Sequence, residues 1–200
     1  MFFSEDRAVD ECPCCSSRPL TSIRRYDNRT ANFLNPERRV PIMFGIELEV
    51  GCDQNEYQSA CVKKMYDALA TAVAPEEYAI FKRDGSLDDV SGFEIVTRPD
   101  CPSVHKRIFG KVLETDLSGY MSSYDNGHCG IHIHVSRETL SPLWIGRMLV
   151  LINSKDMYDV IRKVAGRGSN SYTKVMDKKL TDCMSLDADR YEALNITGKK

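Results

Sequence analysis

The segment that most constrains the fold runs from Met43 to Val50, where polar and apolar residues alternate strictly. Successive side chains of a β-strand point to opposite faces of the sheet, so this pattern predicts a half-buried strand. Its apolar side chains are expected to face the core, while Glu47 and Glu49 share the opposite face. A slip of one residue would carry both carboxylates into the core, which fixes the register of this strand.

The same alternation returns between Gly130 and Ser136. The three apolar residues of this segment are expected to face the core, which leaves His132 and His134 together on the opposite face. Two imidazoles on one strand are a common way to present ligands to a metal ion. A purely structural role for the two histidines weighs equally when this segment is taken alone.

A third predicted strand, Gly92 to Arg98, adds Glu94 and Arg98 to one face. These two residues are either a plain ion pair or a metal ligand beside an anion-binding group. Just upstream, Lys82, Arg83 and Asp84 are expected at the rim of the same face. Asp84 is the weaker candidate, because an Asp-Gly pair is usually only a turn.

Helical patterns at 56–73, 103–117 and 141–165 are interspersed with these strands, and the last is expected to break near residue 153. Short amphipathic strands mixed with helices predict an α+β fold, with a largely antiparallel sheet and helices packed on one face. Residues 41–200 are expected to form this core. Residues 1–40 lack a sustained apolar period and are expected to form an irregular N-terminal arm.

Composition narrows the range of partners. The net charge is only −2, which gives no electrostatic reason to expect nucleic acid or a membrane surface as partner. No apolar run reaches the roughly 18 residues of a membrane span, and the first residues do not have the pattern of a signal peptide. A cytoplasmic location is the default expectation.

The eight cysteines fall into two groups. Five are scattered along the core and are expected to be free thiols in a reducing compartment. Cys12, Cys14 and Cys15 are dense enough to suggest part of a zinc site, but a structural Zn²⁺ ion needs about four ligands and no second pair follows nearby. A flexible, reducible tail is the alternative.

Taken together, several strands place carboxylate or imidazole groups on one face of the sheet. Carboxylate oxygens with one imidazole suit Mg²⁺ or Mn²⁺ better than structural zinc. The sequence has no Walker loop and no Rossmann fingerprint, so a bound nucleotide would be held through metal ions and arginines.

With these residues in view, the chain resembles the amidoligases, which are carboxylate–amine ligases related to glutamine synthetase and glutamate–cysteine ligase. The resemblance spans about residues 41–197 and keeps the order and spacing of the family's motifs. It is carried by Phe44–Glu49, by Asp84–Leu87 with Gly92–Pro99, by Cys129–Val135, and by Arg167 followed by Tyr172. The block at Cys129–Val135 is also similar to the Gly-x-His-x-His strand of glutamine synthetase.

The resemblance implies a glutamine-synthetase-like sheet that binds ATP with Mg²⁺ or Mn²⁺. The positions that match the family's metal ligands are Glu47, Glu49, Glu94 and His132. The implied catalytic residues are Glu94, Arg98, His134 and Arg167. The implied nucleotide contacts are Arg83, Asp84 and Arg167.

The implied reaction transfers the γ-phosphoryl group of ATP to a substrate carboxylate, and an amine then attacks the acyl phosphate to give a peptide or isopeptide bond. The expected partners are therefore a small-molecule or peptide carboxylate and an amine. Arg98 and Arg167 suggest an acidic substrate, such as a glutamyl group or a peptide C-terminus. A homo-oligomer is also open, because related ligases build sites at subunit contacts.

Two other functions stay open. In the family a further strand with a glutamate and an arginine follows a segment like Arg190–Ile196, and the sequence ends at Lys200, so we expect the core to be incomplete at its C-terminus. A non-catalytic metal- or nucleotide-binding remnant, or an interaction protein, is therefore one alternative. The other is a metal-dependent hydrolase that needs no nucleotide.

Overall fold

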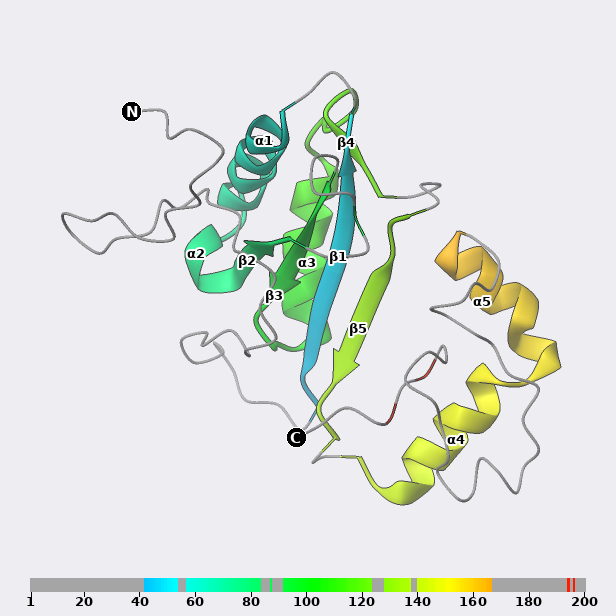
Figure 1. Ribbon diagram of the computed structural model, residues 1–200. Helices are drawn as coiled ribbons and strands as arrows, with labels where there is room; N and C mark the ends of the chain where they lie inside the picture. Colours follow the sequence, from blue (N-terminus) through cyan, green and yellow to red (C-terminus); the bar gives the residue numbers. More distant parts are fainter. Residues whose placement is uncertain are drawn as a thin grey trace. The chain divides into compact units, whose positions relative to one another are not determined.

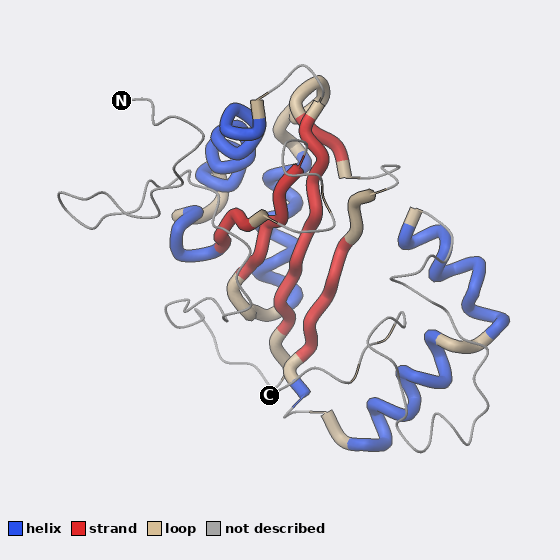
Figure 2. The backbone as a smooth tube through the Cα atoms, viewed as in Figure 1, coloured by secondary structure: helices blue, strands red, loops and turns tan. Residues whose placement is uncertain are grey.

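The computed structural model describes residues 42–53, 57–83, 87, 92–123, 128–137, 140–166, 194 and 196. Within these residues the chain has an α+β fold with an antiparallel sheet of five strands and with five α-helices (Figures 1 and 2). It divides into two compact units, Met1–Val135 and Ser136–Lys200, and the division falls inside the predicted core. No helix of the described residues is long and apolar enough to cross a membrane.

The sheet is built around one central strand, β1 (Phe44–Cys52). Along one edge β1 pairs antiparallel with β3 (Gly92–Thr97), and β3 pairs in turn with β2 (Ala79–Lys82). Along the other edge β1 pairs with β5 (Ile131–Val135) and, near its C-terminal end, with the two-residue strand β4 (Met121–Ser122). The strands predicted near residues 43–50, 92–98 and 130–136 are confirmed, whereas β4 was not predicted.

The helices of this unit are α1 (Gln58–Ala70), the single turn α2 (Pro75–Tyr78) and α3 (Pro102–Leu113). Both long helices confirm the predicted periodicity. Their apolar stripes pack on the apolar face of the sheet in one buried cluster. Its members are Val50, Cys61, Val62, Met65, Ala68, Leu69, Tyr78, Ala79, Phe81, Phe93, Ile95, Ile108 and Val112. Burying each large apolar side chain here contributes roughly 1.5–3 kcal/mol of transfer free energy.

The expectation that the apolar residues of the last strand lie in the core is wrong for two of them. Ile131 and Ile133 share the apolar face with Leu48 and Ile46, as the register requires, but their side chains are exposed. The buried cluster formed by α1 and α3 includes β1, β2 and β3 and no residue of β5. Alternation therefore fixed the face of these residues, whereas their burial depended on which strands the helices cover.

The second unit contains α4 (Pro142–Ile152), a 3₁₀ turn (Lys155–Met157) and α5 (Tyr158–Ala165). The backbone leaves α4 at Asn153, which confirms the predicted break in the long helical pattern. The Ser141 hydroxyl accepts a hydrogen bond from the Trp144 amide and caps α4. Gly166 ends α5 with a positive φ of 70°, a conformation that suits a residue without a Cβ.

Four of the five scattered cysteines are described, and none of these four forms a disulfide, as expected. Cys61, Cys101 and Cys129 are buried and Cys52 is half-buried. Burial, together with the neighbouring Cys61 thiol, raises the pKa of Cys52 to about 12. The thiol at the end of β1 is therefore protonated at neutral pH. Cys12, Cys14, Cys15 and Cys183 lie outside the described residues.

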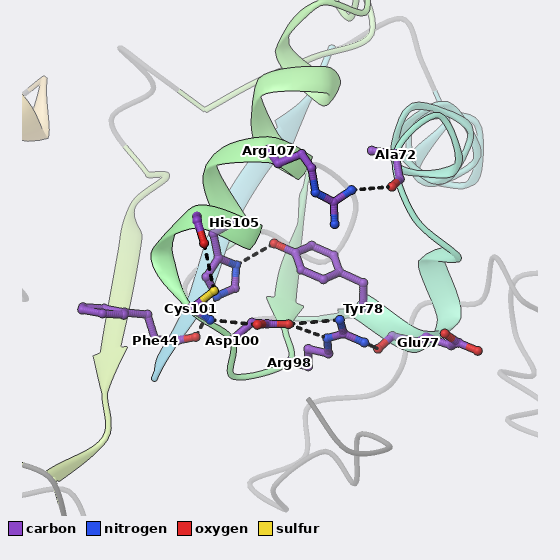
Figure 3. Close-up of polar contacts among 10 residues, drawn as sticks. Phe44, Ala72, Glu77, Tyr78, Arg98, Asp100, Cys101, His105 and Arg107 are labelled. Atoms are coloured by element: carbon purple, nitrogen blue, oxygen red, sulfur yellow. Dashed lines mark hydrogen bonds and ion pairs between the residues drawn. The ribbon is translucent and has the colours of Figure 1, made fainter. Parts of the chain in front are cut away.

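A buried polar network anchors the start of β1 (Figure 3). Phe44 and Asp100 exchange two backbone hydrogen bonds of 2.8 Å, so the segment after β3 folds back onto β1. The Phe44 carbonyl also accepts a bond from Nε2 of His105 on α3. Nδ1 of the same imidazole and the Tyr78 hydroxyl are 2.6 Å apart and share a further hydrogen bond.

An ion pair without solvent access completes this network. The Arg98 guanidinium contacts the Asp100 carboxylate through both Nε and Nη2 at 3.0 Å. Asp100 also accepts a bond from the Cys101 amide, and Arg98 donates to the Glu77 carbonyl. Both side chains are less than 5% exposed. Each charge is therefore compensated within the protein rather than by water.

Replacing Asp100 by alanine should lower the free energy of unfolding by about 3–5 kcal/mol, because it leaves the buried Arg98 guanidinium without its carboxylate. The double variant Arg98→Met with Asp100→Asn removes both charges and should cost less than Asp100→Ala alone. Urea denaturation followed by circular dichroism measures both differences.

Asp67→Ala is the matched control. Asp67 pairs with Lys63 on the exposed side of α1, and both side chains are more than half exposed. Such a pair contributes about 0.5 kcal/mol at most. An Asp100→Ala variant no less stable than Asp67→Ala would show that the buried pair does not stabilise the fold.

Candidate functional site

The polar face of the sheet gathers its charged side chains from four strands. Glu47 on β1 lies directly opposite His132 on β5, and Glu49 lies directly opposite Glu94 on β3. Glu94 in turn lies opposite Lys82 on β2. Directly paired residues of antiparallel strands share a face, with Cβ atoms about 4.5–5.5 Å apart. Register alone therefore brings these five side chains together, and we call them the carboxylate face.

Three members of the carboxylate face are close enough to share one ion. One ligand atom from each of Glu47, Glu94 and His132 lies within 4.8 Å of the other two. Two carboxylate oxygens and one imidazole nitrogen form a donor set that suits Mg²⁺ or Mn²⁺. Glu49 is next to this group and is the fourth residue that the sequence proposed as a ligand.

Burial differs sharply across the face. Glu49 and Glu94 are only 7% and 4% exposed, whereas His132 and His134 on β5 are exposed. Glu47 lies between these extremes, with about a quarter of its side chain exposed. Ionised carboxylates are rarely buried without a compensating cation. The buried side of the face is thus the part that most requires positive charge.

Glu47 connects the two histidines. Its Oε2 atom is 3.4 Å from Nδ1 of His132 and 3.2 Å from Nε2 of His134. Burial alone would raise the pKa of Glu47, but hydrogen bonds and positive charge from both imidazoles outweigh it and hold the pKa far below the usual range. The bonds to Glu47 raise the pKa of both histidines, and burial only partly opposes this.

Arg98 takes a position that the sequence did not predict. Its guanidinium lies in the buried ion pair with Asp100 and over the Tyr78 ring, 5.9 Å from the ring centroid. β3 ends at Thr97, so the strand alternation that placed Arg98 beside Glu94 stops before it reaches Arg98. The spacing Arg-x-Asp was the one signal in the sequence for this pair.

The remaining predicted residues are placed only in part. Arg83 directly follows β2 and is half-buried, next to the carboxylate face in sequence. Asp84 and Arg167 lie outside the described residues, as do the three clustered N-terminal cysteines. Lys82 was predicted only as a rim cation. Its Nζ atom is 3.5 Å from Oε2 of Glu94, with 17% of its side chain exposed.

Comparison with protein-family models, curated proteins and solved structures found no match to this chain. A function for this chain is therefore inferred from the residues of the carboxylate face and their geometry.

Replacing Glu47 by glutamine should lower the pKa of His132 and His134 towards the ordinary imidazole value of 6.5, because the bond to the carboxylate is the main cause of the raised values. Histidine Cε1–H signals followed by NMR against pH, in metal-free buffer, measure both midpoints. The exposed variant Asp67→Asn should leave both unchanged. Equal midpoints in wild type and Glu47→Gln would contradict the prediction.

The same shifts give stability a pH dependence. Because the folded histidines have raised pKa values, their pairing with Glu47 stabilises the metal-free fold fully below pH 6.5, and this contribution is lost as the pH rises through the raised values. Glu47 has a lowered pKa, so its contribution is present above 4.5 and is lost on acidification. The stabilisation of the metal-free fold by the pairing of Glu47 with the two histidines should therefore be greatest between about pH 4.5 and 6.5. It should be much smaller in Glu47→Gln.

Proposed function

We propose that the chain is an ATP- and divalent-metal-dependent carboxylate–amine ligase with a glutamine-synthetase-like sheet. The observation that carries the proposal is the group of ligand atoms from Glu47, Glu94 and His132 within 4.8 Å of one another. The motif resemblance supports it independently, because the same three positions match the metal ligands of the amidoligases.

In this proposal Glu47, Glu94 and His132 hold Mg²⁺ or Mn²⁺, with Glu49 as a further ligand. A divalent ion at that position would neutralise charge on the phosphoryl group in transfer and help to orient it. To coordinate the ion, His132 must be neutral, so metal binding has to displace the proton that Glu47 favours on it. The two carboxylates supply charge in a partly buried setting, where it acts more strongly than in bulk water.

The reaction then has two steps. A carboxylate oxygen of the first substrate attacks the γ-phosphorus of ATP, ADP leaves, and an acyl phosphate forms. The nitrogen of the amine substrate attacks the acyl carbon and forms the C–N bond. The C–O bond to the phosphate breaks, phosphate leaves with that oxygen and the bonding electron pair, and the amine nitrogen loses a proton. His134 is exposed and, in its neutral form, donates from Nε2 to Glu47, so its Nδ1 is the atom we assign to accept that proton.

The substrates in this proposal are a small-molecule or peptide carboxylate and an amine. Arg83, Asp84 and Arg167 are the residues proposed to contact the nucleotide, and a homo-oligomer would offer further side chains at a subunit contact. The basic residues favour an acidic carboxylate substrate, such as a glutamyl group.

A second candidate is metal and nucleotide binding without turnover. The observation that favours it is the engagement of Arg98 with Asp100 in a buried ion pair. An arginine held there would have to break that pair before it could stabilise the phosphoryl oxygens. Both candidates therefore use the same metal and nucleotide site. Only the ligase would also turn ATP over.

Isothermal titration of ATP into the protein should show binding with Mn²⁺ and none in chelator. Glu47→Gln and His132→Ala should each weaken the binding at least about tenfold, because each removes a ligand of the ion. Asp67→Asn should bind as the wild type does. If correctly folded protein shows no metal-dependent ATP binding, the proposed function is wrong.

Phosphate release then separates the two candidates. The ligase should release phosphate from ATP only when both a carboxylate and an amine are supplied from a panel of amino acids and peptides, and Glu94→Gln should abolish it. Metal-dependent ATP binding without release across the panel would favour the non-catalytic candidate. Release of a hydrolysis product without ATP would instead indicate a hydrolase.

A further inference from the structure

Lys82 stands at the buried end of the carboxylate face. It is directly opposite Glu94 across β2 and β3, and Glu94 is directly opposite Glu49 across β3 and β1. The three side chains thus form one row across three neighbouring strands. The Lys82 ammonium is 3.5 Å from Oε2 of Glu94, and its side chain is largely buried.

This row of side chains needs positive charge close to its two carboxylates. Two carboxylates directly opposite each other on neighbouring strands repel, and burial strengthens the repulsion because water screens it less. Glu49 and Glu94 are both less than 10% exposed. Lys82 offers one positive charge in contact with one of them. The imidazoles of His132 and His134 contact Glu47 at the other side of the face.

We propose that Lys82 is a built-in cation of the carboxylate face, which neutralises Glu94 when no divalent ion is bound and competes with that ion for the same carboxylate. The inference rests on the proposed function in one respect only, namely that the divalent ion binds Glu94. Lys82 is a positioning residue in this account, because it acts through Glu94.

The two roles of Lys82 affect two measurable quantities in opposite directions. Loss of its charge leaves the buried carboxylates less compensated, so the metal-free protein becomes less stable. The same loss removes a repulsion on the incoming ion. With metal–oxygen distances of about 2.1 Å, Lys82 would lie roughly 5–6 Å from the ion. One unit charge at that distance from a divalent ion weakens binding roughly tenfold even with water-like screening.

The test compares Lys82→Met and Lys82→Gln with the wild type in two measurements. Mn²⁺ binding is followed by the loss of the free-ion signal in electron paramagnetic resonance, and the unfolding temperature is measured in chelator. Both variants should bind Mn²⁺ roughly tenfold more tightly and unfold at a lower temperature without metal. Lys82→Arg keeps the charge and should bind Mn²⁺ as weakly as the wild type.

Lys63→Met is the matched control, since it removes a lysine from an exposed ion pair on α1. It should change neither quantity. A purely structural role for Lys82 would lower the unfolding temperature and leave Mn²⁺ affinity unchanged or weaker, which would overturn the inference. An unchanged unfolding temperature in both neutral variants would also overturn it.

The outcomes separate this inference from the proposed function. If the wild type binds Mn²⁺ and the neutral variants, folded by circular dichroism, bind it no more tightly, only the role of Lys82 is lost. If neither the wild type nor any variant binds Mn²⁺, the metal site fails and both proposals fail with it. Binding by the neutral variants alone would support competition by Lys82.

Discussion

The hydrogen bonding of β1 along both of its edges is the constraint on which the candidate site depends. β3 pairs with one edge and β5 with the other, so the carboxylate face exists only where all three strands are in register. The start of β1 is held at Phe44 by Asp100 and His105, and Asp100 is held by Arg98. This buried polar network thus anchors the strand that carries Glu47 and Glu49.

The carboxylate face combines groups that would be unfavourable one at a time. Two acids are buried, yet each charged neighbour offsets part of the cost: Lys82 at one side, and two imidazoles at the other. The cationic groups thus contact the carboxylates from both sides of the face. In the proposed function, binding of a divalent ion would displace protons from imidazole and weaken one ion pair, without refolding of the sheet.

Much of the face could be predicted because strand alternation has a period of two. Glu47, Glu49, Glu94 and His132 were assigned to one face from that pattern alone, and the register confirms it. Tertiary packing decided the rest. Arg98 follows the last residue of β3, where alternation no longer applies, and the exposure of Ile131 depends on which strands the helices cover. The periodicity of a segment does not show where its strand ends or which strands the helices will cover.

The position of β5 at the edge of the described sheet has a consequence for motion. β5 is paired with β1 and contributes nothing to the buried cluster, so it could separate while α1, α3 and the other strands stay packed. Amide hydrogens of such a strand exchange with solvent through local opening, at a smaller free energy than global unfolding. That opening would carry His132 away from Glu47 and Glu94. An ion bound by all three residues would therefore oppose this opening and slow amide hydrogen exchange in β5 far more than in the core.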